Sequence, residues 1–262
     1  MKKVSVIGAG KIGGSLVQRL SASGGFDLTI SDIHRERLER FAEGHGVRAT
    51  PSNKEAAGES DLIIVAVKPW DLRTILDEIS PTIEDEEKAV VSVAAGVPIS
   101  AMAARLPEGT AVLRVMPNVC AAVGLGSAVV AANGPGEAHL PVVMEIFQHV
   151  GEVIELPERL FDAATALHGS GPAYVALFAD ALVQAGVREG IPRDIARRLV
   201  NGTIAGTAAL LKERAAHQIR DEVMTPGGTT AAAFVAMEKA GFVAAVYDGV
   251  EAATERARRL AK

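Results

Sequence analysis

A glycine-rich stretch near the start of the chain has the residue types and spacing for binding a dinucleotide. Gly8, Gly10 and Gly13 form a Gly-x-Gly-x-x-Gly pattern directly after the mainly apolar run 4–7. In such a turn the first glycine permits the bend, the second lets a diphosphate approach the backbone, and the third packs the next helix against the strand. Apolar residues at 12, 16 and 20 predict that helix, whose free N–H groups would hold the diphosphate.

An acidic residue follows this turn at the distance that dinucleotide binding requires. A second strand is predicted over 28–32, and it ends at Asp32, 19 residues after Gly13. The Asp32 carboxylate would accept hydrogen bonds from the adenosine ribose of NAD and would repel a 2′-phosphate. Arg35 and Arg37 lie in the same turn and could pair with that phosphate. The residues therefore leave the choice between NADH and NADPH open.

Two later loops carry groups that suit an anionic substrate. The first is His168–Tyr174, and the second is Met224–Thr230, which holds three threonines and two adjacent glycines ahead of a helix predicted from Ala231. Hydroxyls and free N–H groups at the start of a helix suit a carboxylate. Ser and Thr also cap helices without any ligand, which is the structural alternative. Two loops of the same kind favour the functional interpretation.

The elements that would position these groups alternate between strands and helices. Helices are expected at 34–45 and about 137–150. Mainly apolar strands are expected within 4–7, 28–32, 61–67, 89–96, 111–116, 126–131 and 151–156. This alternation predicts an α/β fold with a doubly wound Rossmann sheet. Ligands of such sheets bind outside the carboxyl ends of the strands. There, Ala94 and Ala95 would let a flat nicotinamide approach the backbone, and the Asn118 amide could bind its carboxamide or ribose.

The character of the chain changes at Pro157, after which no strand is expected. We predict a Rossmann dinucleotide-binding domain over 1–157 and an all-helical substrate and dimerisation domain over 158–262. Because a small helical domain with several apolar faces often completes its core against a second copy, we predict a homodimer through it. Trp70 and Tyr174 are interpreted as packing residues.

The composition excludes several classes of protein. The formal net charge of −5 over 262 residues argues against a nucleic-acid partner. No apolar run reaches the length of a membrane span, and the start of the chain reads as a strand rather than a targeting segment. The single cysteine, Cys120, suits a reducing cytoplasm. The six histidines show no paired spacing, so no metal site is expected.

The chain resembles the pyrroline-5-carboxylate reductase family over essentially its whole length. The resemblance rests on five motifs: Gly8–Gly13, Ala66–Pro69, Arg114–Asn118, Gly169–Tyr174 and Asp221–Thr230. The last one continues into Met237–Phe242 and is the most specific. The family pairs a Rossmann domain with a helical domain that interlocks in a dimer, and sometimes in rings of dimers. The implied reaction is reduction of 1-pyrroline-5-carboxylate to L-proline with NADPH or NADH.

The glycine turn and the resemblance together give the expected binding residues. For the cofactor these are Gly8, Ala9, Gly10, Lys11, Ile12, Gly13, Ser31, Asp32, Arg35, Asn53, Ala66, Val67, Lys68, Pro69, Ala94, Ala95 and Asn118. For the substrate they are Thr225, Pro226, Gly227, Gly228, Thr229 and Thr230. By resemblance, this loop holds the substrate carboxylate, and Thr230 lies near the ring nitrogen as the candidate catalytic residue. No titratable side chain is required, because the iminium can arrive already protonated.

Three positions differ from the usual family pattern. Val119-Cys120 replaces Thr-Pro, His168 replaces a serine, and Met224 replaces a small or hydroxyl residue. His168 is interpreted either as a proton donor or as a hydrogen-bonded junction residue. The alternatives to the implied activity are a related cyclic-imine reductase, a β-hydroxyacid dehydrogenase and a non-catalytic NAD(P)-binding sensor. The dehydrogenase would need a lysine base, for which Lys212 and Lys239 are the interior candidates.

Overall fold

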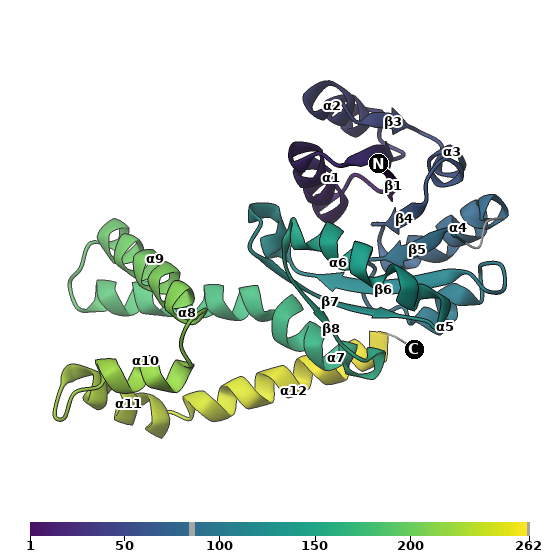
Figure 1. The fold of residues 1–262 in the computed structure, drawn as a ribbon. Coiled ribbons are helices and arrows are strands. Elements are labelled where there is room, and N and C mark those ends of the chain that lie inside the picture. The colour runs from purple at the N-terminus through teal and green to yellow at the C-terminus, as the bar shows by residue number, and fades with distance from the viewer. Residues whose placement is uncertain (84–86, 261–262) are drawn as a thin grey trace. The chain divides into compact units, whose positions relative to one another are not determined.

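The computed structural model describes residues 1–83 and 87–260, without the side chain of residue 260. The chain forms two compact units (Figure 1). One comprises residues 1–170 together with those from 253 onward, and the other comprises residues 171–252. The last strand of the first unit ends at Glu155, and all later elements are helical among the described residues. The domain boundary at 157 stays a prediction.

The first unit is built on one sheet of eight strands, in the order β3-β2-β1-β4-β5-β6-β7-β8. The strands are β1 (Lys2–Ile7), β2 (Phe26–Ser31), β3 (Arg48–Thr50), β4 (Leu62–Val65), β5 (Ala89–Ser92), β6 (Ala111–Pro117), β7 (Gly126–Ala132) and β8 (Gly151–Glu155). From β3 to β6 all neighbouring strands are parallel. β7 runs antiparallel to β6 and parallel to β8, so the last two strands are reversed.

The register places three strand ends at one level of the sheet. Ile7, the last residue of β1, lies opposite Ser31 of β2 on one side and Val65 of β4 on the other. The loops that follow these three strands therefore leave the same carboxyl edge next to one another. This edge is where ligands of doubly wound sheets bind.

Helices cover both faces of the sheet and bury its apolar side chains in two clusters. One cluster joins Val4 and Val6 of β1 to α1 (Lys11–Ser23), α2 (Arg35–His45) and α6 (Leu140–Gln148). The other joins Ile7 to α3 (Asn53–Gly58), α4 (Pro69–Ile79), α5 (Ile99–Ala103) and α7 (Phe161–Ala164). Successive side chains of a strand point to opposite faces, so β4 and β5 are buried along their whole length. The predicted doubly wound fold is confirmed.

Short helical turns connect these elements. They are η1 (Ser80–Thr82), η2 (Val119–Val123), η3 (Pro135–His139) and η4 (Glu158–Leu160), with the π-helical turn η5 (Thr165–Gly169). The helix predicted from about 137 therefore begins as a 3₁₀ turn and becomes α6 only at Leu140. Strand β3 was not predicted, because three residues that include Arg48 show no apolar run.

The second unit consists of helices. They are α8 (Gly171–Arg188), α9 (Arg193–Leu210), α10 (Ala216–Val223), α11 (Thr229–Lys239) and α12 (Phe242–Leu260), whose last residues belong to the first unit (Figure 1). Within 171–252, all of which is described, only Val183 and Ala196 are buried. Large apolar side chains such as Leu177, Leu199 and Tyr247 are exposed. A unit with so few buried residues does not contain a core of its own.

A helix that spans a membrane needs about 20 mainly apolar residues. Among the described residues, no single helix is long and apolar enough to cross a membrane. The pair formed by Thr229–Lys239 and Phe242–Arg259 reaches this by length and composition only, and it is bent by 52°.

Candidate functional site

The glycine turn after β1 has the geometry that its sequence pattern implies. Gly8 has a φ of +105°, and a Cβ there would lie 2.7 Å from the Ala66 carbonyl oxygen. A Cβ on Gly13 would lie 2.0 Å from the Gly8 carbonyl oxygen. Gly10 differs, because nothing lies within 4 Å of its ideal Cβ position and it is the N-cap of α1 without a side-chain cap. The turn thus leaves an open approach to the free N–H groups of α1.

Asp32 lies at the end of β2 and ties this turn to the neighbouring loop. Its carboxylate is buried and accepts hydrogen bonds from the Ala9 N–H at 2.7 Å and the His34 N–H at 2.8 Å. The Arg37 guanidinium lies 3.3 Å from the same carboxylate. A carboxylate has about four lone-pair sites, so a ribose hydroxyl would share it with these three donors. Asp32 therefore positions the glycine turn before any ligand binds.

Ser31 and Asn53 are brought together beneath the same edge. The Ser31 hydroxyl donates to the Asn53 Oδ1 atom at 2.9 Å, and the Asn53 amide donates to Glu78 at 2.9 Å. Both side chains are buried. These hydrogen bonds fix the amide orientation and join the β2 loop to α3 and α4.

A basic hollow lies beside the glycine turn, between α1 and α2. Its volume is about 490 Å³, and it is lined by Ala9, Gly10, Lys11, Gly14, Ser15, Gln18, Arg37, Arg40, Phe41 and His45. The lining contains four basic side chains and no carboxylate. Arg35, the arginine selected from the sequence, is not part of it, because its side chain is 91% exposed and pairs with Glu39 at 2.9 Å. The arginines that line this hollow are therefore Arg37 and Arg40, which lie three residues apart on α2.

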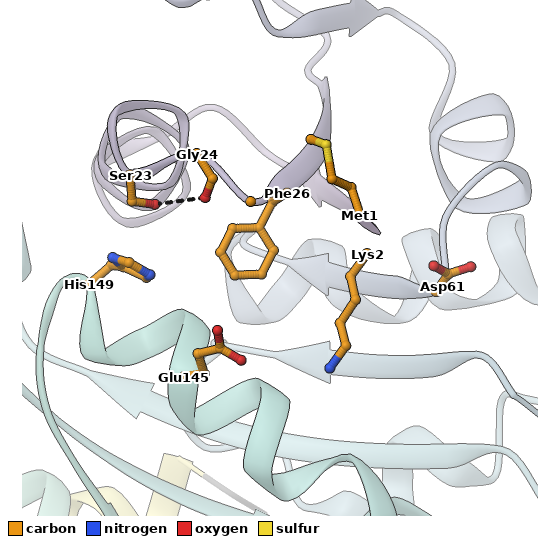
Figure 2. Close-up of a pocket in the computed structure, with 9 residues that line it drawn as sticks. Met1, Lys2, Ser23, Gly24, Phe26, Asp61, Glu145 and His149 are labelled. Carbon is orange, nitrogen blue, oxygen red and sulfur yellow. Dashed lines mark hydrogen bonds between the residues drawn. The ribbon is translucent and has the colours of Figure 1, made fainter.

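A second hollow of about 590 Å³ lies at the opposite edge of the sheet (Figure 2). Lys2 and Phe26, from the amino ends of β1 and β2, line it together with Glu145 and His149. The pKa of His139 is lowered, mainly by burial of its ring and to a smaller extent by the charge of Lys2. Because dinucleotides bind at the carboxyl ends of parallel strands, this hollow is not the cofactor site.

The loops after β4 and β5 complete the carboxyl edge. The Ala66 N–H donates to the Ile7 carbonyl at 2.7 Å, which holds the β4 loop against the glycine turn. Lys68 is the N-cap of α4 and Pro69 its first residue. Ala94 is buried and Ala95 is exposed. The packing interpretation of Trp70 was wrong, because its side chain is 74% exposed: the helix that begins at Pro69 turns it away from the core.

Asn118 and His168 join the end of β6 to η5. The Asn118 side chain accepts from the Cys120 N–H at 3.1 Å and the Ser127 N–H at 3.3 Å, and it donates to the His168 carbonyl at 3.1 Å. The two ring nitrogens of His168 contact the carbonyl oxygens of Ala164 at 2.6 Å and Met116 at 2.8 Å. Both ring nitrogens thus contact backbone carbonyl oxygens. This favours the interpretation of His168 as a hydrogen-bonded junction residue over its interpretation as a proton donor.

The predicted substrate loop in the second unit forms a tight turn before α11. The Gly228 N–H donates to the Thr225 carbonyl at 3.0 Å, and Gly227 has a φ of +69°. Gly228, rather than a threonine, is the N-cap of α11, and no side chain caps the helix. Thr229 and Thr230 are its first two residues. The structural alternative of threonine capping is therefore not realised, and the first N–H groups of α11 stay available for an anion.

The fold and the turn define a Rossmann-type dinucleotide-binding protein with an added helical unit. Residues 3–96 match the family model described as NADP oxidoreductase, coenzyme F420-dependent. Residues 158–260 match the model of pyrroline-5-carboxylate reductase dimerisation, which indicates a homo-oligomer. A pyrroline-5-carboxylate reductase of Synechocystis is 38% identical, over 99% of this chain and 98% of its own. The chain belongs to the pyrroline-5-carboxylate reductase family, as its motifs predicted.

Solved structures agree with this assignment. A pyrroline-5-carboxylate reductase from Coxiella burnetii is 30% identical and aligns with a TM-score of 0.93 over 99% of this chain and 98% of its own. A pyrroline carboxylate reductase from Plasmodium falciparum, solved with NADP bound, is 29% identical. It aligns with a TM-score of 0.86 over 100% of this chain and 98% of its own.

Proposed function

We propose that this protein reduces 1-pyrroline-5-carboxylate to L-proline with NADPH or NADH. The observation that carries the proposal is similarity along the full length to reductases of this name, together with a glycine turn that is open at Gly10. A nicotinamide cofactor supplies the hydride for such a reaction. The protein supplies binding and orientation. The proposed cofactor-binding residues are those named from the sequence, with Arg37 and Arg40 of the basic hollow in place of Arg35.

The chain's own groups explain how a dinucleotide would be held. The N–H groups at the start of α1 receive the diphosphate, because Gly10 leaves them uncovered. Asp32 fixes the turn through the Ala9 N–H and has lone pairs left for a ribose hydroxyl. Ala94 and Ala95 present backbone without long side chains, which admits a flat ring. Asn118 is held by three backbone partners, so one N–H of its amide is left for the cofactor.

The turn before α11 is the proposed substrate-binding site. The hydroxyls of Thr225, Thr229 and Thr230 and the first N–H groups of α11 would bind the substrate carboxylate. Thr230 is the proposed catalytic residue, since its hydroxyl would orient the ring nitrogen that keeps its proton during hydride addition. Gly228 is needed because a Cβ there would lie 2.4 Å from the Thr225 hydroxyl oxygen.

The proposed assembly is a homodimer through the second unit. Its support is the dimerisation model over 158–260 and the presence of only two buried residues within 171–252. A ring of such dimers is the further assembly that the family resemblance implies. We place the enzyme in the cytoplasm, where the single cysteine would stay reduced.

The test is oxidation of NADPH and of NADH, followed separately with and without 1-pyrroline-5-carboxylate. Substrate-dependent oxidation is expected with at least one cofactor. Thr230→Ala should lower kcat by about 10- to 1000-fold while the Kd of the cofactor is retained. Thr74→Ala, an exposed threonine on α4, is the matched control and should keep full activity. Binding of a dinucleotide without any oxidation would favour the non-catalytic sensor. A kcat of Thr230→Ala equal to that of the wild type would exclude this loop from the mechanism.

A further inference from the structure

Trp70 is a large aromatic side chain that the packing of the first unit does not use. It is the only tryptophan of the chain, and it is the second residue of α4. Burying an indole is strongly favourable, yet this side chain is 74% exposed. An exposed aromatic ring at the ligand-binding edge of a Rossmann sheet suggests a surface for an apolar part of the ligand.

A second exposed apolar side chain lies on the other side of the glycine turn. Ile33 directly follows Asp32 and is 86% exposed. Ile7 lies opposite Ser31 on one side and Val65 on the other. The loop of Ile33 after β2 and the start of α4 after β4, which carries Trp70, therefore flank the glycine turn. Among the described residues of the loops after β1, β2, β4 and β5 and of the first turns of the helices that follow these loops, Ile33 and Trp70 are the large apolar side chains that are exposed.

The spacing between these loops suits a planar ring. The backbones of β2 and β4 are separated by two inter-strand distances, which is about 10 Å. A planar base with an apolar group on each face needs about 7 Å, from two contacts of about 3.5 Å.

The position of Asp32 indicates which part of a dinucleotide would reach this gap. In a Rossmann fold the acid at the end of β2 holds the ribose of the adenosine, and the glycine turn holds the diphosphate. The base attached to that ribose is adenine, which is flat and apolar on both faces. The adenine therefore extends along the edge where Ile33 and Trp70 are exposed.

We propose that Trp70 stacks on the adenine of the bound cofactor, with Ile33 as the opposite wall. This inference rests on the proposed function, because it requires a dinucleotide at the glycine turn. Trp70 acts only in binding, since the adenine takes no part in hydride transfer. The Trp70 side chain therefore lowers the Kd of the cofactor and does not affect kcat.

The lone tryptophan makes the stacking directly measurable. ADP-ribose carries the adenine and the diphosphate but no nicotinamide, so it does not absorb the emission of an indole. Adding ADP-ribose to the full-length protein should quench the fluorescence of Trp70 saturably, because all tryptophan emission comes from this residue. Nicotinamide mononucleotide, which lacks adenine, should leave the emission unchanged at the same site occupancy.

Substitution provides the second measurement. Stacking of a base on an aromatic side chain contributes enough that Trp70→Ala should raise the Kd of ADP-ribose by about 5- to 100-fold, measured by calorimetry. The Kd of nicotinamide mononucleotide and kcat at saturating cofactor should stay the same. Trp70→Phe should restore most of the affinity. Ile154→Ala on β8, at the far edge of the sheet, is the control for loss of an exposed apolar side chain.

The outcomes separate this proposal from the function on which it rests. An unchanged Kd of ADP-ribose in Trp70→Ala, or binding without quenching, would overturn the stacking and leave the reductase in place. If ADP-ribose quenches Trp70 in the wild-type protein, but 1-pyrroline-5-carboxylate causes no oxidation of NADPH or NADH, the reductase is overturned and the stacking stands. A wild-type protein that binds neither ADP-ribose nor NADPH nor NADH would overturn both.

Discussion

The structural role of Asp32 can be tested by removing its carboxylate. Asp32→Ala deletes the acceptor for two backbone N–H groups, those of Ala9 and His34, and the partner of Arg37. Ala9 is buried, so its N–H would lose the one hydrogen-bond partner described for it. If the carboxylate served only as a ribose acceptor, the cofactor-free protein would not be affected.

The expected loss of stability follows from these contacts. An unsatisfied buried N–H costs about 1–3 kcal/mol, and the hydrogen bond from His34, made to a charged group, contributes about 1.5 kcal/mol more. The Arg37 guanidinium is 45% exposed, so its ion pair adds less than about 1 kcal/mol. We expect Asp32→Ala to lower the free energy of unfolding by about 2.5–5.5 kcal/mol. Asp32→Asn, which keeps one acceptor oxygen, should lose about half as much.

Urea unfolding of the cofactor-free protein measures this change. Far-UV circular dichroism follows the unfolding, because Trp70 is already 74% exposed in the folded protein. Wild type and variants are compared at one protomer concentration, because oligomer formation contributes to stability. Asp27→Ala, an exposed carboxylate on the same strand, is the matched control and should change the free energy of unfolding by less than about 0.5 kcal/mol. A stability of Asp32→Ala equal to that of the wild type, with a large loss of dinucleotide affinity, would refute the structural role.

Two further predictions concern the basic hollow and a buried ion pair. Arg40→Ala should lower kcat/KM with NADPH by about 5- to 20-fold and leave kcat/KM with NADH nearly unchanged, because Arg40 would face the 2′-phosphate; equal losses with both cofactors would contradict this. Glu158→Ala should lower the free energy of unfolding in urea by about 3–5 kcal/mol. It leaves the Arg114 guanidinium, which is 5% exposed and 3.0 Å from Glu158, without its partner; a loss below about 1 kcal/mol would contradict the assigned charge pairing.

Much of the fold was predictable because its signals are local. The glycine turn, the apolar strands and the change to helices after Pro157 each come from consecutive residues. The reversed direction of β7 was not predicted, although its signal was present. Only residues 118–125 separate β6 from β7, whereas a parallel crossover needs about a dozen residues or more. A connection this short allows only an antiparallel neighbour.

The site was predictable at the level of loops and less so at the level of side chains. The sequence identified the turn after Ser31, but it could not show which arginine faces the hollow, since that depends on the phase of α2. It selected Asp32 for a ligand and missed its bond to the Ala9 N–H, a contact between residues 23 apart. The exposure of Trp70 was missed for a similar reason, because one aromatic residue after a proline does not reveal which face of the helix is covered.

The scarcity of buried residues in the second unit has a consequence for how the protein is made. The sheet of the first unit is complete at Glu155, so it can begin to fold while the rest of the chain is still being synthesised. Residues 171–252 bury only Val183 and Ala196, so in the proposed homodimer they would acquire a core only when a second polypeptide arrives. The last stage of maturation would then be bimolecular, and its rate would rise with the number of chains that are translated close together.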